Sequence, residues 1–399
     1  MANLLYLVHR IPYPPNKGDK IRSFHWLQHL AAKHRVYLGT FVDDPDDLEF
    51  IERLDSYCAD TCILPLDPRW AKFRSLRGLL QGTALTLPYY ANGKMRAWVQ
   101  EKVNENSIDA VFAFSSAMAQ FVDPRWKLLK IIDFVDVDSD KWQQYAQSKP
   151  PWSAWIYRRE GRRLLEFDRQ VAADFDVSLF VSRAEAELFR ELAPEVAARV
   201  DSIENGVDLE YFQGGREYSC PYAPGEQVFV FTGAMDYWAN IDAVRWFAKE
   251  VFPEILKHHV EARFYIVGAR PAEAVKSLAR QEGIVVTGGV PDIRPYLAHA
   301  RVSVAPLRIA RGIQNKVLEA MAMGKPVLAT SMAMDGLEEG RNLAVHLSDD
   351  PAQQAECGRR LLRQRAFLPR YSPINRRYIE MRYSWDRHLE KLDALLEQC

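Results

Sequence analysis

The feature that most constrains the fold is a repeated alternation of short apolar runs with longer amphipathic stretches. In the first half of the chain, apolar runs at residues 3–8 and 35–41 alternate with amphipathic stretches at residues 20–34 and 48–58. Runs that are apolar at most positions predict strands buried on both faces, and the amphipathic stretches predict helices that cover them. Such an alternation is typical of βαβ units, so we expect a parallel sheet flanked by helices.

The alternation stops near the middle of the chain and then starts again. A segment rich in Gly, Pro and polar residues at 211–224 predicts a hinge. Before it, further strands are predicted at residues 110–114, 128–134 and 177–181. After it, the pattern predicts strands at residues 227–232, 263–267, 283–287, 302–305 and 326–329, with helices at 240–258 and 314–323.

The length of the chain agrees with two such domains. A chain of 399 residues exceeds the roughly 250 to 300 residues beyond which single cores stop growing. We therefore expect an α/β protein with two Rossmann-like parallel-sheet domains, at residues 1–205 and 206–380. The tail at residues 381–399 carries a helical stripe of leucines, and we expect it to pack back toward the N-terminal domain.

Charge and cysteine content narrow the functional classes. The 52 basic and 53 acidic side chains leave a formal net charge of -1, which argues against nucleic acid as a partner. The five cysteines are few, odd in number and scattered, as is typical of reduced thiols in the cytoplasm. No apolar run approaches the roughly 20 residues of a membrane helix. We expect a cytoplasmic protein, with peripheral attachment to the inner face of a membrane as the second option.

Ligands of parallel α/β sheets bind beyond the carboxyl ends of the strands, so the strand-to-helix turns are the candidate sites. The first turn follows His9 and contains Gly18, with Lys17, Lys20 and Arg22 around it. This turn is either an anion-receiving loop or a Pro-rich turn with solvated charges. The second turn begins at Gly233, where a glycine serves close approach to a ligand about as often as packing.

The third turn carries the clearest signal. Arg308, Arg311 and Lys316 place three cations beside Gly312 at a predicted helix start, which suits a diphosphate. Glu319 lies one helical turn beyond Lys316 and on the same face. A carboxylate there can accept hydrogen bonds from two vicinal hydroxyls, such as those of a ribose.

Residues 304–327, which contain this third turn, resemble the donor-site signature of the retaining family 4 glycosyltransferases (glycosyl transferases group 1), which have the GT-B fold. Supporting similarities lie at residues 9–18, 181–185, 205–208, 233–236, 288–293 and 383–385. Within this family, residues 10–15 and 133–139 are most similar to sugar transferases of exopolysaccharide and exosortase (PEP-CTERM) gene clusters, which implies a bacterial protein.

The resemblance implies roles for individual residues. Arg308 and Lys316 would hold the donor pyrophosphate, Glu319 the ribose, and Gly233 would offer its backbone to a phosphate. The loop at residues 289–293, with Val290, would cover the base. The predicted donor-binding set is Gly18, Gly233, Val290, Arg308, Arg311, Gly312, Lys316 and Glu319. The family's glutamate pair is spaced eight apart, and Arg311 stands where the first would fall, so contacts to the donor sugar depart from the family pattern.

Asp136, and after it Asp138, follow an apolar strand and are the candidates for orienting or deprotonating the acceptor hydroxyl, and His9 is a third. Helix capping and a metal pair are the alternatives for the two aspartates, and a structural hydrogen bond is the alternative for His9. Cations and backbone donors would stabilise the leaving diphosphate, so we expect no required metal or cofactor and a UDP- or GDP-sugar as donor substrate.

Two basic and aromatic stretches, at residues 70–80 and 152–163, lie in the half expected to bind the acceptor. They are either contacts for anionic lipid headgroups, which would suit a lipid-linked acceptor, or solvated helix faces. The sequence thus predicts a hexosyltransferase-type enzyme (EC 2.4) acting on a saccharide or lipid-linked acceptor in exopolysaccharide or cell-surface glycan synthesis. A nucleotide-sugar epimerase of the same fold and a non-catalytic nucleotide-binding protein are the alternatives.

Overall fold

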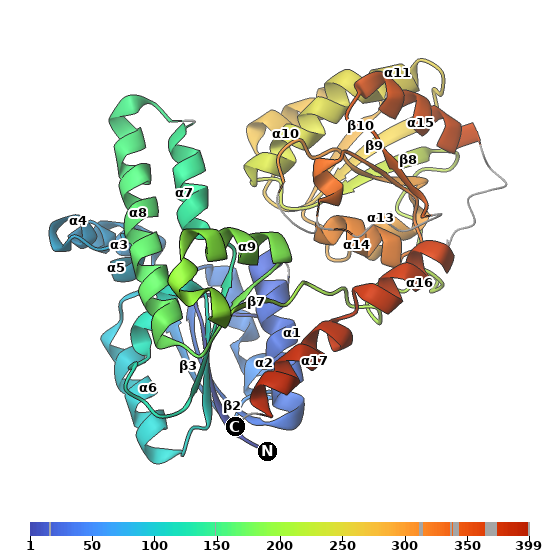
Figure 1. Ribbon diagram of the computed structural model, residues 1–399. Helices are drawn as coiled ribbons and strands as arrows, with labels where there is room; N and C mark the ends of the chain where they lie inside the picture. The colour runs from blue at the N-terminus through green and yellow to red at the C-terminus, as the bar shows by residue number, and fades with distance from the viewer. Residues whose placement is uncertain are drawn as a thin grey trace. The chain divides into compact units, whose positions relative to one another are not determined.

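The computed structural model describes residues 1–399 except 16, 148, 311–313, 336, 338–342, 364–372 and 398–399. The chain forms two compact units, the first from residues 1–204 with 389–399 and the second from residues 205–388. Each unit is a parallel β-sheet with helices on both of its sides (Figure 1). The α/β class with two parallel-sheet domains, predicted from the sequence alternation, is confirmed.

The sheet of the first unit has seven strands in the order β3-β2-β1-β4-β5-β6-β7, and all their pairings are parallel. The strand order reverses direction between β1 and β4, which makes this position the topological switch point. The strands are β1 (Asn3–Val8), β2 (Arg35–Val42), β3 (Asp60–Pro65), β4 (Ala110–Phe114), β5 (Leu129–Val135), β6 (Val177–Phe180) and β7 (Val200–Ser202).

The helices of the first unit cover both faces of this sheet. Leu5 and Leu7 of β1 pack in one core cluster with Met95 of α6. On the opposite face, the ring of Phe112 meets Trp26 of α1 edge to face, with centroids 6.4 Å apart. The helical segments are α1 (Gly18–Lys33), η1 (Pro45–Phe50), α2 (Ile51–Asp55), α3 (Pro68–Ser75), α4 (Arg77–Gln81), α5 (Thr86–Tyr90), α6 (Gly93–Glu105), η2 (Ser116–Phe121), α7 (Asp138–Gln147), α8 (Pro151–Asp174), α9 (Arg183–Leu192) and η3 (Pro194–Arg199).

The C-terminal helix α17 (Trp385–Leu396) adds its later turns to the first unit. Asp393 accepts hydrogen bonds from Lys33 Nζ at 2.6 Å and pairs with His29 Nε2 at 2.8 Å, both on α1. Leu389, Leu392 and Leu396 are buried, as the leucine stripe requires.

The second unit repeats the arrangement with six strands in the order β10-β9-β8-β11-β12-β13, again all parallel. Its switch point lies between β8 and β11. The strands are β8 (Gln227–Thr232), β9 (Ala262–Val267), β10 (Ile284–Gly288), β11 (Val302–Ala305), β12 (Val327–Ala329) and β13 (Val345–Leu347). The helical segments are α10 (Trp238–Trp246), η4 (Phe247–Val251), α11 (Phe252–Leu256), α12 (Glu273–Lys276), η5 (Ser277–Arg280), α13 (Arg294–His299), α14 (Asn315–Ala322), η6 (Met332–Met334), α15 (Pro351–Arg363) and α16 (Pro373–Arg382).

The helix predicted at residues 240–258 is not a single α-helix. It is α10, then a π-helical turn at Phe247–Val251, then α11. Pro253 explains the wider turn, because proline has no backbone N–H and its ring clashes with the carbonyl four residues earlier. The sequence analysis also placed no strand at β3, β7 or β13, which are three of the four edge strands of the two sheets.

Two sequence motifs that lie far apart in the chain pack together in the second unit. A Cβ on Gly206 would come within 2.5 Å of the backbone nitrogen of Trp385, so only glycine fits there. The N–H of Val207 donates to the carbonyl of Tyr383 at 2.7 Å.

Among the described residues, no helix combines the length and the apolar character needed to cross a bilayer.

A buried ion pair ties α1 to the sheet of the first unit. Arg22 Nε donates to Asp133 Oδ2 of β5 at 2.6 Å, and both side chains are almost wholly buried. The guanidinium also lies over the ring of Trp26, 4.9 Å from its centroid. Each partner therefore depends on the other, because an unpaired charge at this depth is strongly unfavourable.

We expect Asp133→Ala to lower the free energy of unfolding by about 3 to 5 kcal/mol, since it leaves the Arg22 guanidinium buried without its carboxylate. Urea denaturation followed by circular dichroism would measure the change. Asp123→Ala removes an ion pair with Arg125, whose side chain is 87% exposed, and is the matched control. We expect that control to leave stability nearly unchanged, because solvent screens an exposed ion pair. Equal losses for the two variants would contradict the importance assigned to the buried pair.

Candidate functional site

Two glycines bring the backbone together at the carboxyl edge of the second sheet. Gly233 follows β8, and Gly268 follows the neighbouring strand β9. A Cβ on Gly268 would lie 1.7 Å from the carbonyl oxygen of Gly233, so no other residue fits between these two turns. The turn after β8 is thereby held against the turn after β9, at the sheet edge where ligands of parallel sheets bind.

Lys316 is held against this turn by a specific hydrogen bond. Its Nζ donates to Asn240 Oδ1 at 3.0 Å, and Asn240 Nδ2 in turn donates to the carbonyl of Ala234 at 2.9 Å. The same ammonium lies over the ring of Phe231, 5.1 Å from its centroid. A Cβ on Gly233 would come within 2.8 Å of Asn240 Nδ2 and 3.5 Å of Lys316 Cε. The lysine is therefore fixed in position at the start of α14, beside the backbone of the β8 turn.

Glu319 lies one turn further along α14. Burial lowers the pKa of Lys316 to about 8, although the charge of Glu319 opposes the shift. Burial raises the pKa of Glu319 to about 7, with the charge of Lys316 acting in the opposite direction. The charges of the two groups thus influence each other's pKa. A ligand that offers an anion to the lysine and hydroxyl donors to the carboxylate would stabilise the charged forms of both.

Arg308 follows β11 at the same sheet edge, but its guanidinium already has a partner. It forms a bidentate pair with Asp242 of α10, Nε to Oδ2 at 3.0 Å and Nη2 to Oδ1 at 2.5 Å. Its side chain is half exposed and lies over the ring of Trp246. Arg308 would therefore have to be shared between Asp242 and a ligand phosphate. Arg311 and Gly312, predicted in the same loop, lie outside the described residues.

The loop after β10 is anchored by an aspartate and an arginine. Asp292 accepts bidentate hydrogen bonds from Arg294 at 2.8 to 3.0 Å. The guanidinium of Arg294 lies 3.8 Å from the ring centroid of Tyr211, whose hydroxyl reaches Asp292 at 3.4 Å. Val290 is partly buried and packs against the core of the second unit. Burial raises the pKa of Tyr211, the charge of Asp292 adds to the shift, and the charge of Glu319 on α14 makes a smaller contribution in the same direction.

The carboxyl edge of the first sheet has its own group of predicted residues. His9, at the end of β1, stacks on Phe114 with ring centroids 5.9 Å apart. Its Nε2 lies 3.5 Å from Asp19 Oδ2, and its Nδ1 is buried without a hydrogen-bond partner among the described residues. Burial alone would raise the pKa of Asp19, but the hydrogen bond and charge of His9 and the charge of Arg10 together lower it well below its usual value.

Asp136 and Asp138, just beyond β5, share one cation. Lys141 Nζ lies 2.6 Å from Asp136 Oδ2 and 3.3 Å from Asp138 Oδ1. The side chain of Asp138 is half exposed, and its carboxylate lies within the electrostatic reach of His9. The structure therefore gathers the three predicted catalytic residues at one sheet edge, with an ammonium group between the two aspartates.

A buried carboxyl group lies near these residues and was missed by the sequence analysis. Asp168 of α8 accepts a short hydrogen bond from Ser116 Oγ, which follows β4 at the switch point. Burial raises the pKa of Asp168 to about 8, the charges of Asp138 and Glu160 add to the shift, and the bond from Ser116 opposes it. Asp168 therefore carries a proton at neutral pH. No local pattern marks it, because its importance comes from burial.

The turn around Gly18 was considered as an anion-receiving loop. In the structure, two of its cations pair with carboxylates of the first unit. Lys20 Nζ is buried and pairs with Asp47 at 2.9 Å, and Arg22 pairs with Asp133. Both cations are paired with carboxylates inside the first unit, so of the three cations named around Gly18 only Lys17 is left for an external anion, and anion binding by this turn stays a prediction. Gly18 is the first residue of α1, and a Cβ there would meet no atom within 4 Å.

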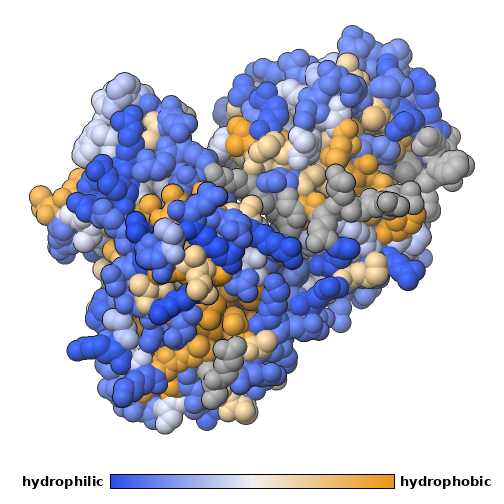
Figure 2. Space-filling view, viewed as in Figure 1, coloured by the Kyte–Doolittle hydropathy of each residue, from blue (hydrophilic) through white to orange (hydrophobic). Residues whose placement is uncertain are grey.

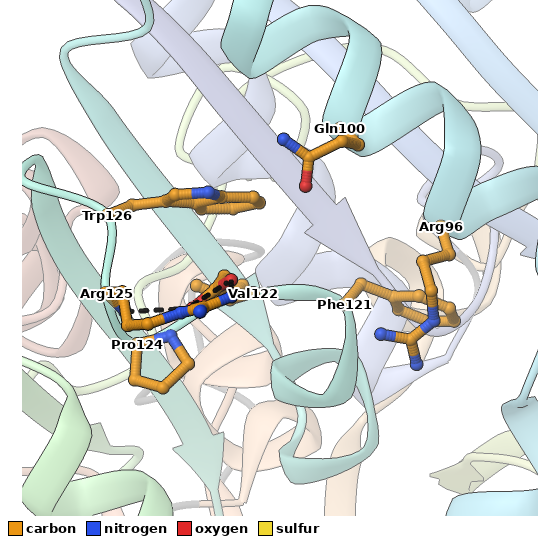
Figure 3. Close-up of a pocket in the computed structure, with 8 residues that line it drawn as sticks. Arg96, Gln100, Phe121, Val122, Pro124, Arg125 and Trp126 are labelled. Carbon is orange, nitrogen blue, oxygen red and sulfur yellow. Dashed lines mark hydrogen bonds and ion pairs between the residues drawn. The ribbon is translucent and has the colours of Figure 1, made fainter.

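The cavity drawn in Figure 3 lies in the first unit. It has a volume of about 420 Å³ and lies between α6 and the segment that precedes β5. Figure 3 shows Gln100 and Trp126 on one side of this space and Arg125 on the other. None of the predicted site residues lines it.

Comparison with known proteins connects the second unit to one family. Residues 226–364 match the family model described as glycosyl transferases group 1, and this range contains Gly233, Lys316 and Glu319. The sequence matches none of the curated proteins.

Solved structures resemble the chain over its whole length. Sucrose-phosphate synthase from Thermosynechococcus elongatus is 16% identical with a TM-score of 0.71, over 100% of this chain and 99% of that one. HepE from Anabaena, solved with UDP and glucose, is 14% identical with a TM-score of 0.68, over 100% of both chains. WaaG, a glycosyltransferase of lipopolysaccharide biosynthesis, is 17% identical with a TM-score of 0.60, over 99% and 98%. At these identities the likeness shows that this chain shares their two-domain fold.

We expect Gly268→Ala to destabilise the second unit by about 1 to 3 kcal/mol, since its Cβ would overlap the carbonyl of Gly233 and push the two turns apart. Gly289→Ala is the matched control, because a Cβ there meets only Ala269 at an ordinary 3.6 Å. Thermal denaturation of the two variants would measure the difference. Wild-type stability in Gly268→Ala would contradict the close approach of the two turns.

Proposed function

We propose that this protein is a glycosyltransferase that moves a sugar from a nucleoside-diphosphate sugar to a saccharide or lipid-linked acceptor. One observation carries the proposal: Lys316 is held by Asn240 beside the Gly233 backbone, at the start of α14, with Glu319 one turn further on. A fixed cation and a helix N-terminus suit a diphosphate, and a carboxylate one turn away suits a ribose. The family match of residues 226–364 supports the same reaction class.

The proposed reaction depends on electrostatics. Negative charge develops on the diphosphate as it leaves the sugar, and Lys316, with Arg308 shared from Asp242, would stabilise that charge from fixed positions. At the other reacting atom, an acceptor hydroxyl must lose a proton. Asp138 is the better placed of the two aspartates, because it is the more exposed and lies further from the shared Lys141.

The finer parts of the proposal are a UDP-sugar donor, retention of configuration at the transferred sugar, and an acceptor in exopolysaccharide or cell-surface glycan synthesis. The solved complex of HepE with UDP and glucose makes UDP-glucose the first donor to test. The resemblance of residues 304–327 to retaining enzymes supports retention. An epimerase of the same fold would convert the donor without any acceptor, and a non-catalytic protein would bind it unchanged. Chromatography of UDP-glucose incubated with the protein, with and without saccharide acceptors, distinguishes the three.

The donor site is tested by nucleotide binding. We expect one of UDP, GDP and ADP, or one of their sugars, to bind, and Glu319→Ala to weaken that binding by about 1 to 3 kcal/mol through loss of a charged hydrogen-bond partner. Isothermal calorimetry with a thermal-shift screen would measure it. Glu273→Ala, at a side chain that is 82% exposed in the same unit, is the matched control and should bind like the wild type. Failure of every nucleotide to bind at near-millimolar concentration would remove the main support for the transferase.

The pH dependence of donor binding follows from the two shifted groups. Lys316 is charged below a pKa of about 8, and Glu319 is ionised above a pKa of about 7. We therefore expect affinity for UDP-glucose to be highest between these values and to fall by up to about tenfold per pH unit on either side. Calorimetry across this range would show it, and UDP-glucose is preferred to UDP because its diphosphate has no terminal phosphate to titrate. Glu319→Gln should abolish the acidic decrease, and Lys316→Arg should abolish the alkaline one. A flat profile would show that neither group faces the donor.

A further inference from the structure

Six large hydrophobic side chains are exposed on one part of the first unit. They lie on α3, on α4 with the residue before it, and at the start of α8, and the most exposed are Leu80 at 91%, Trp152 at 78% and Trp70 at 71%. The full set is Trp70, Phe73, Leu76, Leu80, Trp152 and Trp155. We call this surface the aromatic face. Isolated exposed apolar residues are ordinary, but a group of six on adjoining elements indicates a binding surface.

The elements of the aromatic face are fixed to one another. Arg159 of α8 donates to the carbonyl of Gly78 at 2.8 Å and to that of Thr83 at 3.0 Å. The buried carboxylate of Glu160 accepts from the backbone N–H groups of Leu85 and Thr86 at 2.6 and 3.0 Å. Trp155 precedes Arg159 by one helical turn and so lies on the side of α8 that carries α4. Figure 1 shows α3, α4 and α5 as a projection beside α8.

The charge on the aromatic face is of one sign. Residues 68–100 contain six lysines and arginines and no aspartate or glutamate. Residues 149–159 contain three more basic residues and again no acidic one. Among these cations, Arg69, Lys72, Arg77 and Arg158 are exposed. The acidic residue that borders α3, Asp67, is used as the helix cap and accepts from the N–H of Arg69 at 2.8 Å.

We propose that the aromatic face docks on the surface of an anionic lipid bilayer. Tryptophan prefers the headgroup region because its ring is apolar and its N–H is polar, while leucine and phenylalanine gain by entering the acyl boundary. Exposed lysines and arginines between them attract anionic headgroups. Figure 2 shows hydrophobic residues at the tip of the α3–α4 projection, surrounded by hydrophilic ones. Membrane docking goes beyond the proposed sugar transfer and does not depend on it.

Vesicle flotation of the full chain tests the proposal. The probes are vesicles of phosphatidylcholine alone and vesicles of phosphatidylcholine mixed with phosphatidylglycerol, both without nucleotide. We expect the protein to float with the mixed vesicles at least roughly tenfold more strongly than with the neutral ones, and less strongly as salt is added. Arg69→Gln/Lys72→Gln/Arg77→Gln should lower binding roughly a hundredfold, because the variant lacks three cations that are each attracted to the anionic surface. Trp70→Ser/Phe73→Ser/Leu80→Ser should lower it by at least roughly tenfold.

The matched control is Val260→Ser/Met381→Ser, which removes two exposed apolar side chains from the second unit and should leave flotation unchanged. Every variant should keep the circular dichroism spectrum of the wild type, because all the substituted side chains are exposed. Failure to float with the mixed vesicles at low salt would overturn the proposal, as would equal binding to both kinds of vesicle or an equal loss in the control. If the face instead covers a second copy of the chain, the wild type would sediment as a dimer without lipid and the serine variant as a monomer, and the proposal would be wrong.

Discussion

The parallel pairing of the strands is the constraint on which the rest of this structure depends. In a parallel sheet all the carboxyl ends lie at one edge, and every strand must be followed by a crossover that returns to the opposite edge. The turns after β1, β4 and β5 therefore meet at one edge of the first sheet, and those after β8, β9 and β11 at one edge of the second. Residues that are distant in sequence become neighbours there without any local signal for their contact.

Most charged groups near these edges are already paired, and this limits where an anion can bind. Lys20 and Arg22 are neutralised by carboxylates inside the first unit, and Arg308 is bound by Asp242 at the surface of the second. Lys316 differs because its partner is the neutral oxygen of Asn240, so its positive charge is oriented without being cancelled. Burial is also the reason why its pKa is lowered, against the opposing charge of Glu319, and why a diphosphate would be a favourable partner.

The proposed donor chemistry and the aromatic face belong to different units and depend on different physics. The second unit supplies fixed hydrogen bonds and a buried cation, which favour one small anion in one orientation. The aromatic face of the first unit supplies many exposed apolar and basic groups, which favour an extended anionic surface with no fixed orientation of individual contacts. An enzyme that acts on a lipid-linked acceptor would need both, because its donor is dissolved and its acceptor is confined to a bilayer.

The sequence alone determined the alternation of elements and the position of the strongest donor signal. The bounds of β1, β4, β8 and β11 agree with those predicted, because a strand buried on both faces is a continuous apolar run that can be seen locally. The pairing of Lys316 with Glu319 on one helix face was equally local, since it follows from the helical repeat. Fixing the lysine, however, requires Asn240 from another helix.

Only the tertiary structure decided which charged residues are available to a ligand. The sequence shows Lys20, Arg22 and Lys316 as similar cations after predicted strands. Their partners Asp47, Asp133 and Asn240 come from other elements, and two are carboxylates while the third is an amide. Asp168 is a similar case, because burial raises the pKa of its carboxyl group although the hydrogen bond from Ser116 opposes the shift. Periodicity reports which face a residue occupies, whereas its charge state and its partners depend on segments that only folding brings together.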